Sequence, residues 1–414
     1  MKKKYFPITQ GIACQSKWAW STVFLSEGIT RSCHRASESQ LTTENFQNFH
    51  NTDVKIADRQ KMLDGIWPDG GCNYCRRNEE AGGFSDRLLH NSTPNLTPIE
   101  LETNITATTV SPTLLEVFFD NTCNLACLYC DPQTSSKLAD ENKKFGSFDK
   151  FGVTLPILEV KHTKNLAPEF WKWMETNFHS LKRFHFLGGE PFLQKELDAI
   201  IDFINSHPNP ECELSLVSNL MISKDRLVSY IEKFKQLVKT KKIKLLVITS
   251  SIDCWGVEQE FVRRGLDISI WEENFKYLIE NRWIELNINQ TIGPLAIKTM
   301  PELLVKLNDW KKTRPIGHFF SAISNISYMQ LNIFGPDVFT QDFKKILSLM
   351  TGDREQDKWA IKYMSSIADE IEIKPRNNKE LKKLLIFLDE KDRRHGTNWR
   401  TVFPWLEKEL KDVV

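Results

Sequence analysis

The chain has 414 residues, of which 41% are hydrophobic and 26% charged, values typical of a soluble globular protein with a sizeable core. This length favours two or three structural units over one compact domain. The 55 basic residues nearly balance the 54 acidic ones, giving a formal charge of +1. A balance so close to zero gives no electrostatic case for general binding to nucleic acid or to membrane surfaces.

The N-terminus, MKKKYFPITQGIACQSKWAW, starts with basic residues but lacks the apolar run of a signal peptide. No stretch approaches the ~20 apolar residues that are needed to span a bilayer. We therefore expect a cytoplasmic protein whose nine cysteines serve metal ligation or catalysis and not disulfide bonds.

The first hundred residues carry four cysteines, namely Cys14, Cys33, Cys72 and Cys75. Four thiolates with a closing C-x-x-C pair can hold zinc or a fully protein-ligated iron–sulfur cluster, and the spacing leaves both open. The stretch that follows, 91–113, is rich in Thr, Asn, Ser and Pro and shows little apolar periodicity. We expect an irregular connection there and place a domain boundary near residue 108.

After that boundary, short apolar segments alternate with longer amphipathic ones. The expected strands are 114–120, 183–189, 214–219, 243–253, 284–291 and 326–333. The expected helices include 168–181, 194–207 and 223–240. Repeated βα units predict an α/β fold with a parallel sheet flanked by helices, and six strands suit a partial barrel better than a complete eight-stranded one. Residues 341–414 are predicted to be mostly helical.

The segment CNLACLYC places Cys123, Cys127 and Cys130 in a loop directly after the first of these strands. Parallel α/β folds have their functional sites at this carboxyl end of the strands. Three thiolates on one tight loop can hold three irons of a cubane cluster, which leaves the fourth iron for a small molecule. The alternatives are a zinc site completed from elsewhere in the chain and three ordinary cysteines.

This CxxxCxxC segment, with Tyr129 in its aromatic position, resembles the signature of the radical S-adenosylmethionine (SAM) enzymes. The resemblance implies a partial (β/α)6 barrel and a [4Fe–4S] cluster whose fourth iron binds the amino and carboxylate groups of SAM. It also implies that an electron from the reduced cluster splits SAM into methionine and a 5′-deoxyadenosyl radical. An electron donor such as a flavodoxin or ferredoxin is then an expected partner.

A glycine-rich turn ends the second predicted strand, in FLGGEP at residues 186–191. Glycines let the backbone approach a ligand and expose its amide groups, while an acid can accept hydrogen bonds from an ammonium. The segment resembles the GGEP motif of the same family, whose backbone and acidic residue hold the SAM amino group. The resemblance implies this role for Gly188, Gly189 and Glu190.

The next predicted strand ends in LVSN, residues 216–219, with two polar side chains. At the carboxyl end of a strand such side chains are placed to meet a ribose or a carboxylate. The segment resembles the strand-end TNG of the family, which implies contacts with SAM from Ser218 and Asn219, although Leu220 replaces the glycine.

The segment SSIDCWGVEQEFVRR, residues 250–264, resembles the S-x-D…R stretch of the family. The resemblance implies that Ser251 and Arg263 contact SAM and that Arg263 clamps its carboxylate. Asp253 would position the ribose or the substrate. Arg264 is the alternative to Arg263 in this role.

Two further cysteines stand alone in the sequence. Cys254 follows Asp253 at a predicted strand end, on the face of the active site, where it is a candidate hydrogen-atom donor to a substrate radical. The alternative is a packed, unreactive thiol. Cys212 begins a strand and is expected to be a packed residue.

The stretches around Cys14 and Cys33, with their tryptophans and the intervening SEGIT turn, resemble part of the auxiliary-cluster domain (SPASM, or the shorter twitch) of radical SAM maturases. The resemblance implies a second [4Fe–4S] cluster on the four N-terminal cysteines, which transfers electrons or shapes the substrate cleft. Structural zinc and four cysteines without a metal remain the alternatives. In relatives this domain usually follows the barrel, whereas here residues 1–108 precede it.

The predicted organisation is an auxiliary-cluster domain at 1–108, a partial barrel at 109–340 and a helical region at 341–414. The predicted function is that of an oxygen-sensitive radical SAM enzyme acting on a ribosomally made peptide or protein, by cross-linking, epimerisation or backbone excision. A leader-binding partner is a further expectation for such a substrate. Two alternatives stay open: a radical SAM enzyme for a small metabolite or RNA nucleoside, and a zinc-stabilised binding protein without catalysis.

Overall fold

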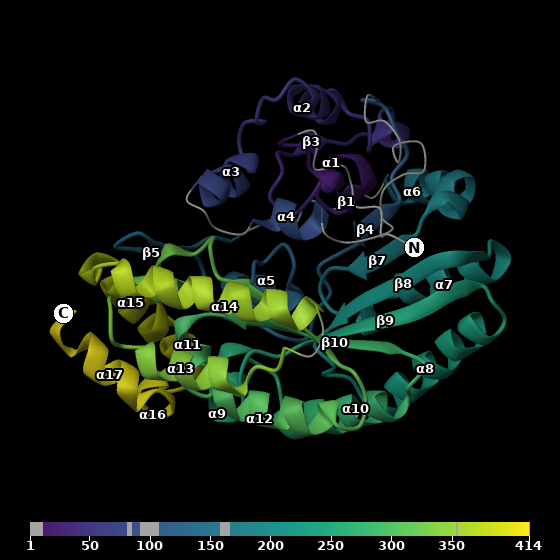
Figure 1. The fold of residues 1–414 in the computed structure, drawn as a ribbon. Helices are drawn as coiled ribbons and strands as arrows, with labels where there is room; N and C mark the ends of the chain where they lie inside the picture. The colour runs from purple at the N-terminus through teal and green to yellow at the C-terminus, as the bar shows by residue number, and fades with distance from the viewer. Residues whose placement is uncertain (1–10, 81–84, 92–106, 158–165, 353–354, 414) are drawn as a thin grey trace. The chain divides into compact units, whose positions relative to one another are not determined.

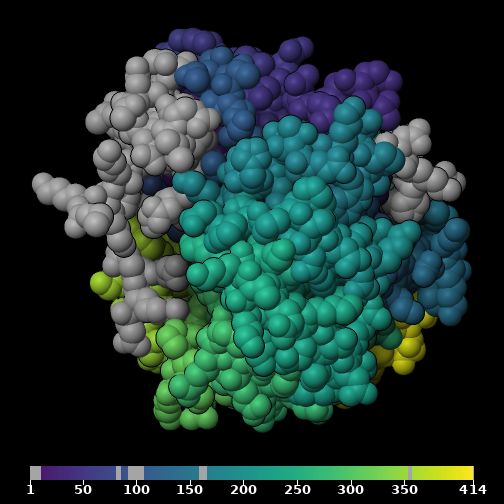
Figure 2. Space-filling model, turned by 90° about the vertical axis from the view of Figure 1, so that its right-hand side faces the viewer, coloured from purple at the N-terminus to yellow at the C-terminus, as the bar shows by residue number. Residues whose placement is uncertain are grey.

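The computed structural model describes residues 11–80, 85–91, 107–157, 166–352 and 355–413, which are coloured by residue number in Figure 1 and Figure 2. Contacts between residues divide the chain into two compact units. Unit 1 is drawn from 1–120, 160–216 and 229–246, and unit 2 from 121–159, 217–228 and 247–414. The sequence-predicted domains, with boundaries near residues 108 and 340, remain predictions beside this division.

Unit 1 is built on a sheet whose central strands are parallel. Its hydrogen-bonded order is β9-β8-β7-β4-β1-β2-β3. The pairs β1–β4, β4–β7 and β7–β8 are parallel, while β1–β2 and β2–β3 are antiparallel. The bounds are β1 (Trp20–Phe24), β2 (Ile29–Arg31), β3 (Ser39–Gln40), β4 (Leu114–Phe118), β7 (Arg183–Leu187), β8 (Asn209–Ser218) and β9 (Ile243–Ser251), of which β8 and β9 continue into unit 2.

The period-two pattern of β7 separates the two faces of this sheet. Phe184 and Phe186 are fully buried, and Phe184 stacks on Phe170 of helix α6 (Leu166–Asn177) with ring centroids 6.4 Å apart. Alternation of this kind buries one face of a strand against a covering helix. Helices α7 (Glu196–Ser206) and α8 (Lys224–Lys239) follow β7 and β8 in the expected βα order.

The cysteine-bearing part of unit 1 consists of short elements before β4. They are α1 (Gln15–Ala19), η2 (Phe46–Asn48), α2 (Asp53–Leu63), α3 (Cys72–Glu80) and α4 (Asp86–Asn91). Helix α2 starts at a capping threonine, because the Thr52 side chain accepts a hydrogen bond from the Lys55 amide. Much of the predicted connection at 91–113 lies outside the described residues.

Unit 2 contains the parallel pairs β9–β10 and β10–β11, with β10 (Glu285–Ile292) and β11 (Gly317–Ala322), and the small hairpin β5 (Phe148–Lys150)–β6 (Val153–Leu155). The helices before residue 340 are α5 (Ser136–Phe145), α9 (Val257–Val262), α10 (Ile268–Glu280), α11 (Pro294–Ile297) and α12 (Met300–Lys311). The helices after it are α13 (Thr340–Leu349), α14 (Glu355–Ile373), α15 (Asn378–His395), α16 (Trp399–Val402) and α17 (Pro404–Leu410), as the charged periodicity predicts.

The α/β class with a parallel sheet is confirmed, and five of the six predicted strands occur as β4, β7, β8, β9 and β10. The sixth was wrong. Residues 326–333 form two single turns, η6 (Ser327–Met329) and η7 (Leu331–Ile333), and the strand is β11, which lies earlier. The alternation in 326–333 arises because Met329, Leu331 and Ile333 are all buried from consecutive turns. In the described residues we find no helix of sufficient length and apolar character to cross a membrane.

Candidate functional site

The three-cysteine loop of unit 2 is fixed to the segment after helix α9 by backbone hydrogen bonds. The amide of Ala126 donates to the Arg264 carbonyl and that of Leu128 to the Val262 carbonyl, each at 2.9 Å. Gly265 has φ +95°, and a Cβ there would lie 3.1 Å from the Asn124 carbonyl oxygen. A glycine is therefore needed where the two segments approach.

Polar groups surround two of the three sulfur atoms of this loop. The Leu125 amide lies 3.5 Å from Cys123 Sγ, and Asn219 Nδ2 lies 3.9 Å from the same atom. The Thr134 hydroxyl is 3.3 Å from Cys130 Sγ and also lies 3.1 Å from the Asp131 carbonyl, which accepts its hydrogen bond. Donors that turn toward a ligating thiolate stabilise it and orient it. The sequence did not single out Thr134, which lies four residues after a cysteine in an otherwise unremarkable loop.

The thiols of this loop lie close enough to influence one another, with Cys127 buried and Cys123 and Cys130 half-buried. Burial raises the pKa of Cys127, the thiols of Cys130 and Cys123 add to this effect, and the charge of Arg263 opposes it. Burial also raises the pKa of Cys130. Buried thiols of this kind release their protons when a metal centre takes the protons' place.

Tyr129, the aromatic residue of the cysteine motif, is hydrogen-bonded to a buried ion pair. Its hydroxyl donates to Asp253 Oδ2 at 2.6 Å. Arg263 donates to both oxygens of the same carboxylate, and its guanidinium carbon is 5.5 Å from the centre of the Tyr129 ring. Tyr129, Asp253 and Arg263, which the sequence singled out separately, are thus hydrogen-bonded to one another through the Asp253 carboxylate. The contacts of Arg263 and Asp253 with SAM remain predictions.

Two glutamines that the sequence did not single out hold Asp253 in place. Gln259 Oε1 accepts hydrogen bonds from the amides of Asp253 and Cys254, at 3.0 and 2.9 Å. Gln290 Nε2 donates to the Asp253 carbonyl at 2.7 Å, and the Thr291 amide donates to the side-chain Oδ1 of Asp253 at 2.8 Å. Glutamines on helices and strands carry no local pattern, so only the folded chain shows these contacts.

The strand-end segment at 218–220 reaches the cysteine loop through one side chain. Asn219 Nδ2 lies 3.0 Å from Asn124 Oδ1, in addition to its contact with Cys123. Leu220 has φ +55° and is fully buried. The leucine therefore adopts the left-handed backbone conformation that a glycine would take without strain.

The glycine pair of unit 1 lies against the end of β4. Gly188 and Gly189 have φ of +92° and +49°, and a Cβ on Gly188 would lie 3.0 Å from the Asp120 carbonyl oxygen. The Glu190 side chain is fully buried and accepts a hydrogen bond from the Phe192 amide at 3.2 Å. The backbone at Gly188 therefore does approach the backbone at Asp120 closely. The contacts of Gly188, Gly189 and Glu190 with SAM remain predictions.

The remaining candidates of unit 2 differ in accessibility. Ser251 ends β9 and is partly exposed. Cys254 is fully buried, and burial raises its pKa well above the usual value. A hydrogen-atom donor has to reach a substrate radical, so the donor role of Cys254 remains a prediction. Cys212 is also fully buried, as expected for a packed residue.

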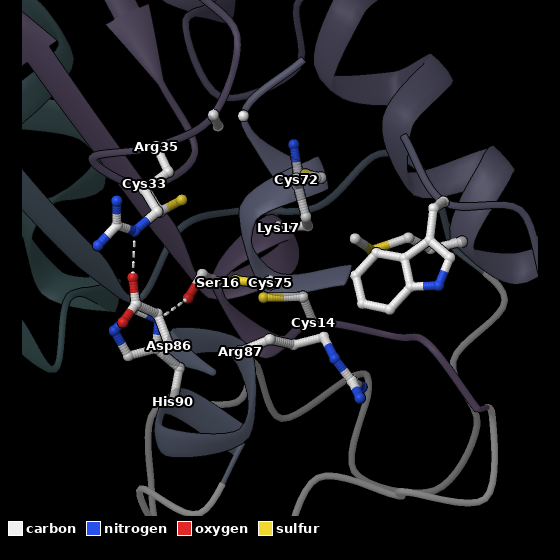
Figure 3. Close-up of a pocket in the computed structure, with 14 residues that line it drawn as sticks. Cys14, Ser16, Lys17, Cys33, Arg35, Cys72, Cys75, Asp86, Arg87 and His90 are labelled. Carbon is white, nitrogen blue, oxygen red and sulfur yellow. Dashed lines mark hydrogen bonds and ion pairs between the residues drawn. The ribbon is translucent and has the colours of Figure 1, made fainter. Parts of the chain in front are cut away.

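The four N-terminal cysteines line one pocket of unit 1 (Figure 3). Cys14 precedes helix α1, Cys33 follows strand β2, and Cys72 and Cys75 lie in the first turn of α3, where the i, i+3 spacing puts them on one face. Gly71 allows this packing, because a Cβ there would lie 1.3 Å from the Arg35 carbonyl oxygen.

These four thiols also act on one another electrostatically. Burial raises the pKa of Cys14 to about 12, with Cys33 and Cys75 adding to the shift. Burial raises the pKa of Cys75 to about 11, and here Cys33 and Cys72 contribute. No group of three or more Cys, His, Asp or Glu side chains within the described ranges is arranged to hold a single metal ion.

No protein-family model and no curated protein matches the chain. Among solved structures it is similar to SuiB of Streptococcus suis bound to S-adenosylmethionine, with 13% identity over 84% of this chain and 69% of that chain and a TM-score of 0.38. A second SuiB structure matches with 14% identity, 80% and 73% coverage and a TM-score of 0.33. TYW1 with a lysine-pyruvate adduct bound matches with 15% identity, 55% and 68% coverage and a TM-score of 0.27. Likenesses with TM-scores this low support no inference about this chain.

Proposed function

We propose that the protein is a radical SAM enzyme with a partial-barrel fold, in which Cys123, Cys127 and Cys130 hold a [4Fe–4S] cluster that leaves one iron for SAM. The observation that carries the proposal is the loop itself. It places three thiols after a strand end, and its surroundings supply polar donors next to the sulfurs of Cys123 and Cys130. Thiolates with such donors match the chemistry of an iron–sulfur cluster.

When bound, the cluster and SAM supply a one-electron cleavage that yields a 5′-deoxyadenosyl radical for hydrogen abstraction. The chain's own residues hold the loop that carries the cluster. Tyr129 ties the loop to the Asp253–Arg263 pair, and Asn219 links it to the end of β8. We assign the SAM amino group to the turn at Gly188, Gly189 and Glu190, and its other contacts to the strand-end residues Ser218, Asn219 and Ser251.

We assign a second [4Fe–4S] cluster to the pocket formed by Cys14, Cys33, Cys72 and Cys75. The four thiols shift one another's pKa, which supports a shared centre. Zinc in this pocket is the competing assignment, and metal analysis separates the two.

We assign the docking of an electron donor to a depression on unit 2, whose lining includes Asn124 and Ala126 of the cysteine loop. Its charged lining residues are four basic ones against two acidic ones, namely Lys137, Lys144, Arg264 and Arg394 against Asp140 and Glu141. A basic surface against the loop favours an acidic one-electron carrier such as a flavodoxin or ferredoxin, because complementary charge speeds encounter.

We assign a ribosomally made peptide or protein as the substrate class, on the likeness of the N-terminal segment to the auxiliary-cluster domain of peptide maturases. Co-expression of the chain with a peptide encoded beside its gene, followed by mass spectrometry, tests this class. A mass change that requires Cys123 supports it. An unmodified peptide, with turnover of a metabolite or nucleoside instead, contradicts it.

Anaerobic reconstitution tests the enzymatic proposal itself. The protein is expected to turn brown, to bind about seven to eight irons if two cubanes form, and to release 5′-deoxyadenosine from SAM under dithionite. Replacing Cys123, Cys127 and Cys130 with alanine abolishes the release and halves the iron. A colourless, zinc-loaded protein that leaves SAM intact would show a binding protein instead.

A further inference from the structure

Three basic side chains are buried in the part of unit 1 that carries the four cysteines, and one of them, Lys17, lines the pocket. Lys17 of α1 has 2% of its surface exposed, and Lys55 and Arg59 of α2 have 1% and 0%. Taking a charge out of water costs several kcal/mol unless an opposite charge compensates it. An anion nearby would stabilise the charged form of each of these three groups.

Lys55 finds only neutral partners among the described residues. Its ammonium donates to the hydroxyls of Ser21 and Thr30 and to the Phe49 carbonyl, each at 2.8 Å. These bonds satisfy its three protons, but burial and the charges of Arg59 and Lys17 lower the pKa of Lys55 well below its usual value. An anion nearby is therefore needed to keep its charge.

Arg59 is bonded in the same manner. Its guanidinium donates to the carbonyls of Lys17, Thr108 and His50, at 2.6, 2.7 and 2.8 Å, and to Asn51 Oδ1 at 2.8 Å. Of these four acceptors none is charged.

A single carboxylate stands near this group in the described part of the chain. Asp58 accepts a hydrogen bond from Lys17, and its charge also acts on Arg59. Asp58 is the one carboxylate bonded to these three basic groups within the described ranges, because Asp86, which lines the pocket, is paired with Arg35.

The pocket is where a compensating anion fits. Lys17 and Cys72 both line the pocket, and Figure 3 shows their side chains at the same side of it. The charge of Lys17 lowers the pKa of the Cys72 thiol, against the larger raising effect of burial. The charges of Cys33 and Lys55 also act on each other. Four thiolates outweigh the positive charge of a [4Fe–4S] core, so the ligated cluster is an anion, and reduction makes it more negative.

We propose that Lys17, Lys55 and Arg59 form a cationic shell for the auxiliary cluster, with Lys17 bonded to the Cys72 sulfur, and that this shell raises the reduction potential of that cluster. The inference rests on the auxiliary cluster of the proposed function. Reduction adds an electron to an anion, so a nearby cation stabilises the reduced form more than the oxidised form. A hydrogen bond to a ligand sulfur acts in the same direction. Lys17 is in this sense a positioning residue.

The test uses the full-length chain with Cys123, Cys127 and Cys130 replaced by alanine, which isolates the auxiliary cluster. Its iron content is counted, and its midpoint potential is measured by a redox titration followed by electron paramagnetic resonance. Two further substitutions are compared in this background, Lys17→Met and Asp58→Asn. The control is Lys61→Met. Lys61 lies on helix α2, as Asp58 does, but it is bonded to the exposed Asp69.

Lys17→Met is expected to lower the midpoint potential by about 59 mV or more, a tenfold change in the reduction equilibrium of one electron. Asp58→Asn removes a negative charge beside Lys17 and is expected to raise the potential. Lys61→Met leaves it unchanged. Two shifts of opposite sign cannot come from a general loosening of the fold.

Four iron atoms with an unchanged potential in both variants overturn the cationic shell and leave the auxiliary cluster standing. Zinc, or no metal, in the triple alanine background overturns the auxiliary cluster and the shell with it, while the three-cysteine loop is judged separately by 5′-deoxyadenosine release. If the Lys17→Met protein folds but binds no iron, the Asp58→Asn variant decides the question. A raised midpoint potential in that variant supports the cationic shell, and an unchanged midpoint potential overturns it.

Discussion

Asp253 and Arg263 form a bidentate ion pair in unit 2, with Nε–Oδ2 and Nη2–Oδ1 distances of 2.9 and 2.8 Å. The Asp253 side chain is fully buried and 8% of the Arg263 side chain is exposed. Tyr129 donates to the same carboxylate, so the aromatic residue of the cysteine motif is anchored to a charge pair more than a hundred residues away in sequence.

Asp253→Asn is expected to destabilise the protein strongly. The substitution leaves the Arg263 guanidinium buried without a counter-charge, a loss of about 3–5 kcal/mol in the free energy of unfolding. Urea denaturation measures it. Asp309→Asn is the matched control, because Asp309 pairs with Lys312 at a well-exposed position. If both variants lost the same free energy of unfolding, the Asp253 carboxylate would not be what compensates the buried charge of Arg263.

Thr134→Val is expected to weaken retention of the cluster on the three-cysteine loop by about 10- to 100-fold, as the loss of an outer-shell donor does in other metal sites. The hydroxyl lies 3.3 Å from Cys130 Sγ. Iron loss to a chelator gives the measurement. Thr134→Ser keeps the hydroxyl and should hold iron as the parent does; a serine variant as weak as the valine variant rules out the donor role.

Glu141→Gln is expected to reduce stability at neutral pH and to have no effect in strong acid. Burial acts to raise the pKa of Glu141, but bonds from His395 and Lys391 outweigh it and lower the pKa to about 2. Because the folded pKa lies below the unfolded one, the stabilisation is present above about pH 4.5 and is lost as the pH falls toward 2.

We expect the Glu141 contribution to be about 2 kcal/mol at pH 7, after allowing for solvent screening. Urea denaturation of the parent and of Glu141→Gln between pH 2 and 7 measures it. The gap between the two curves should close with falling pH. A gap that stays constant over this range would refute the assignment.

Gly188→Ala is expected to destabilise unit 1 by more than an alanine at Gly65. Both glycines have positive φ, +92° and +75°, but only Gly188 would place its Cβ 3.0 Å from the Asp120 oxygen, whereas Gly65 faces open space. Gly65→Ala therefore isolates the backbone strain, of about 1 kcal/mol, and the excess for Gly188→Ala reports the close approach. Identical midpoints in urea would show that no close approach exists.

Lys137→Glu is expected to slow 5′-deoxyadenosine release when reduced flavodoxin supplies the electron and to leave release with dithionite unchanged. The reversal places a like charge opposite an acidic carrier, so the loss should grow at low salt. Lys312→Glu, at an exposed position away from the cysteine loop, is the control. Equal rates with flavodoxin in both variants would exclude docking at this depression.

Local patterns in the sequence were sufficient to predict five strands, the helices between them and the helical C-terminal part, because the periodicity of apolar residues is a property of neighbouring positions. The same periodicity misassigned 326–333, where consecutive turns bury Met329, Leu331 and Ile333 at strand-like spacing. β11 was missed because its sequence, GHFFSA, has little alternation, and its parallel pairing with β10 defines it.

The sequence by itself determined which cysteines, glycines and charged residues form the motifs, since each motif is a short run with its own spacing. Only the tertiary structure decided which of them meet. It pairs β1 with β4, brings four cysteines from separate segments to one pocket with Lys17 beside Cys72, and joins Tyr129 to Asp253 and Arg263. Contacts between distant residues depend on how strands pair and helices pack, and that information is spread over the whole chain.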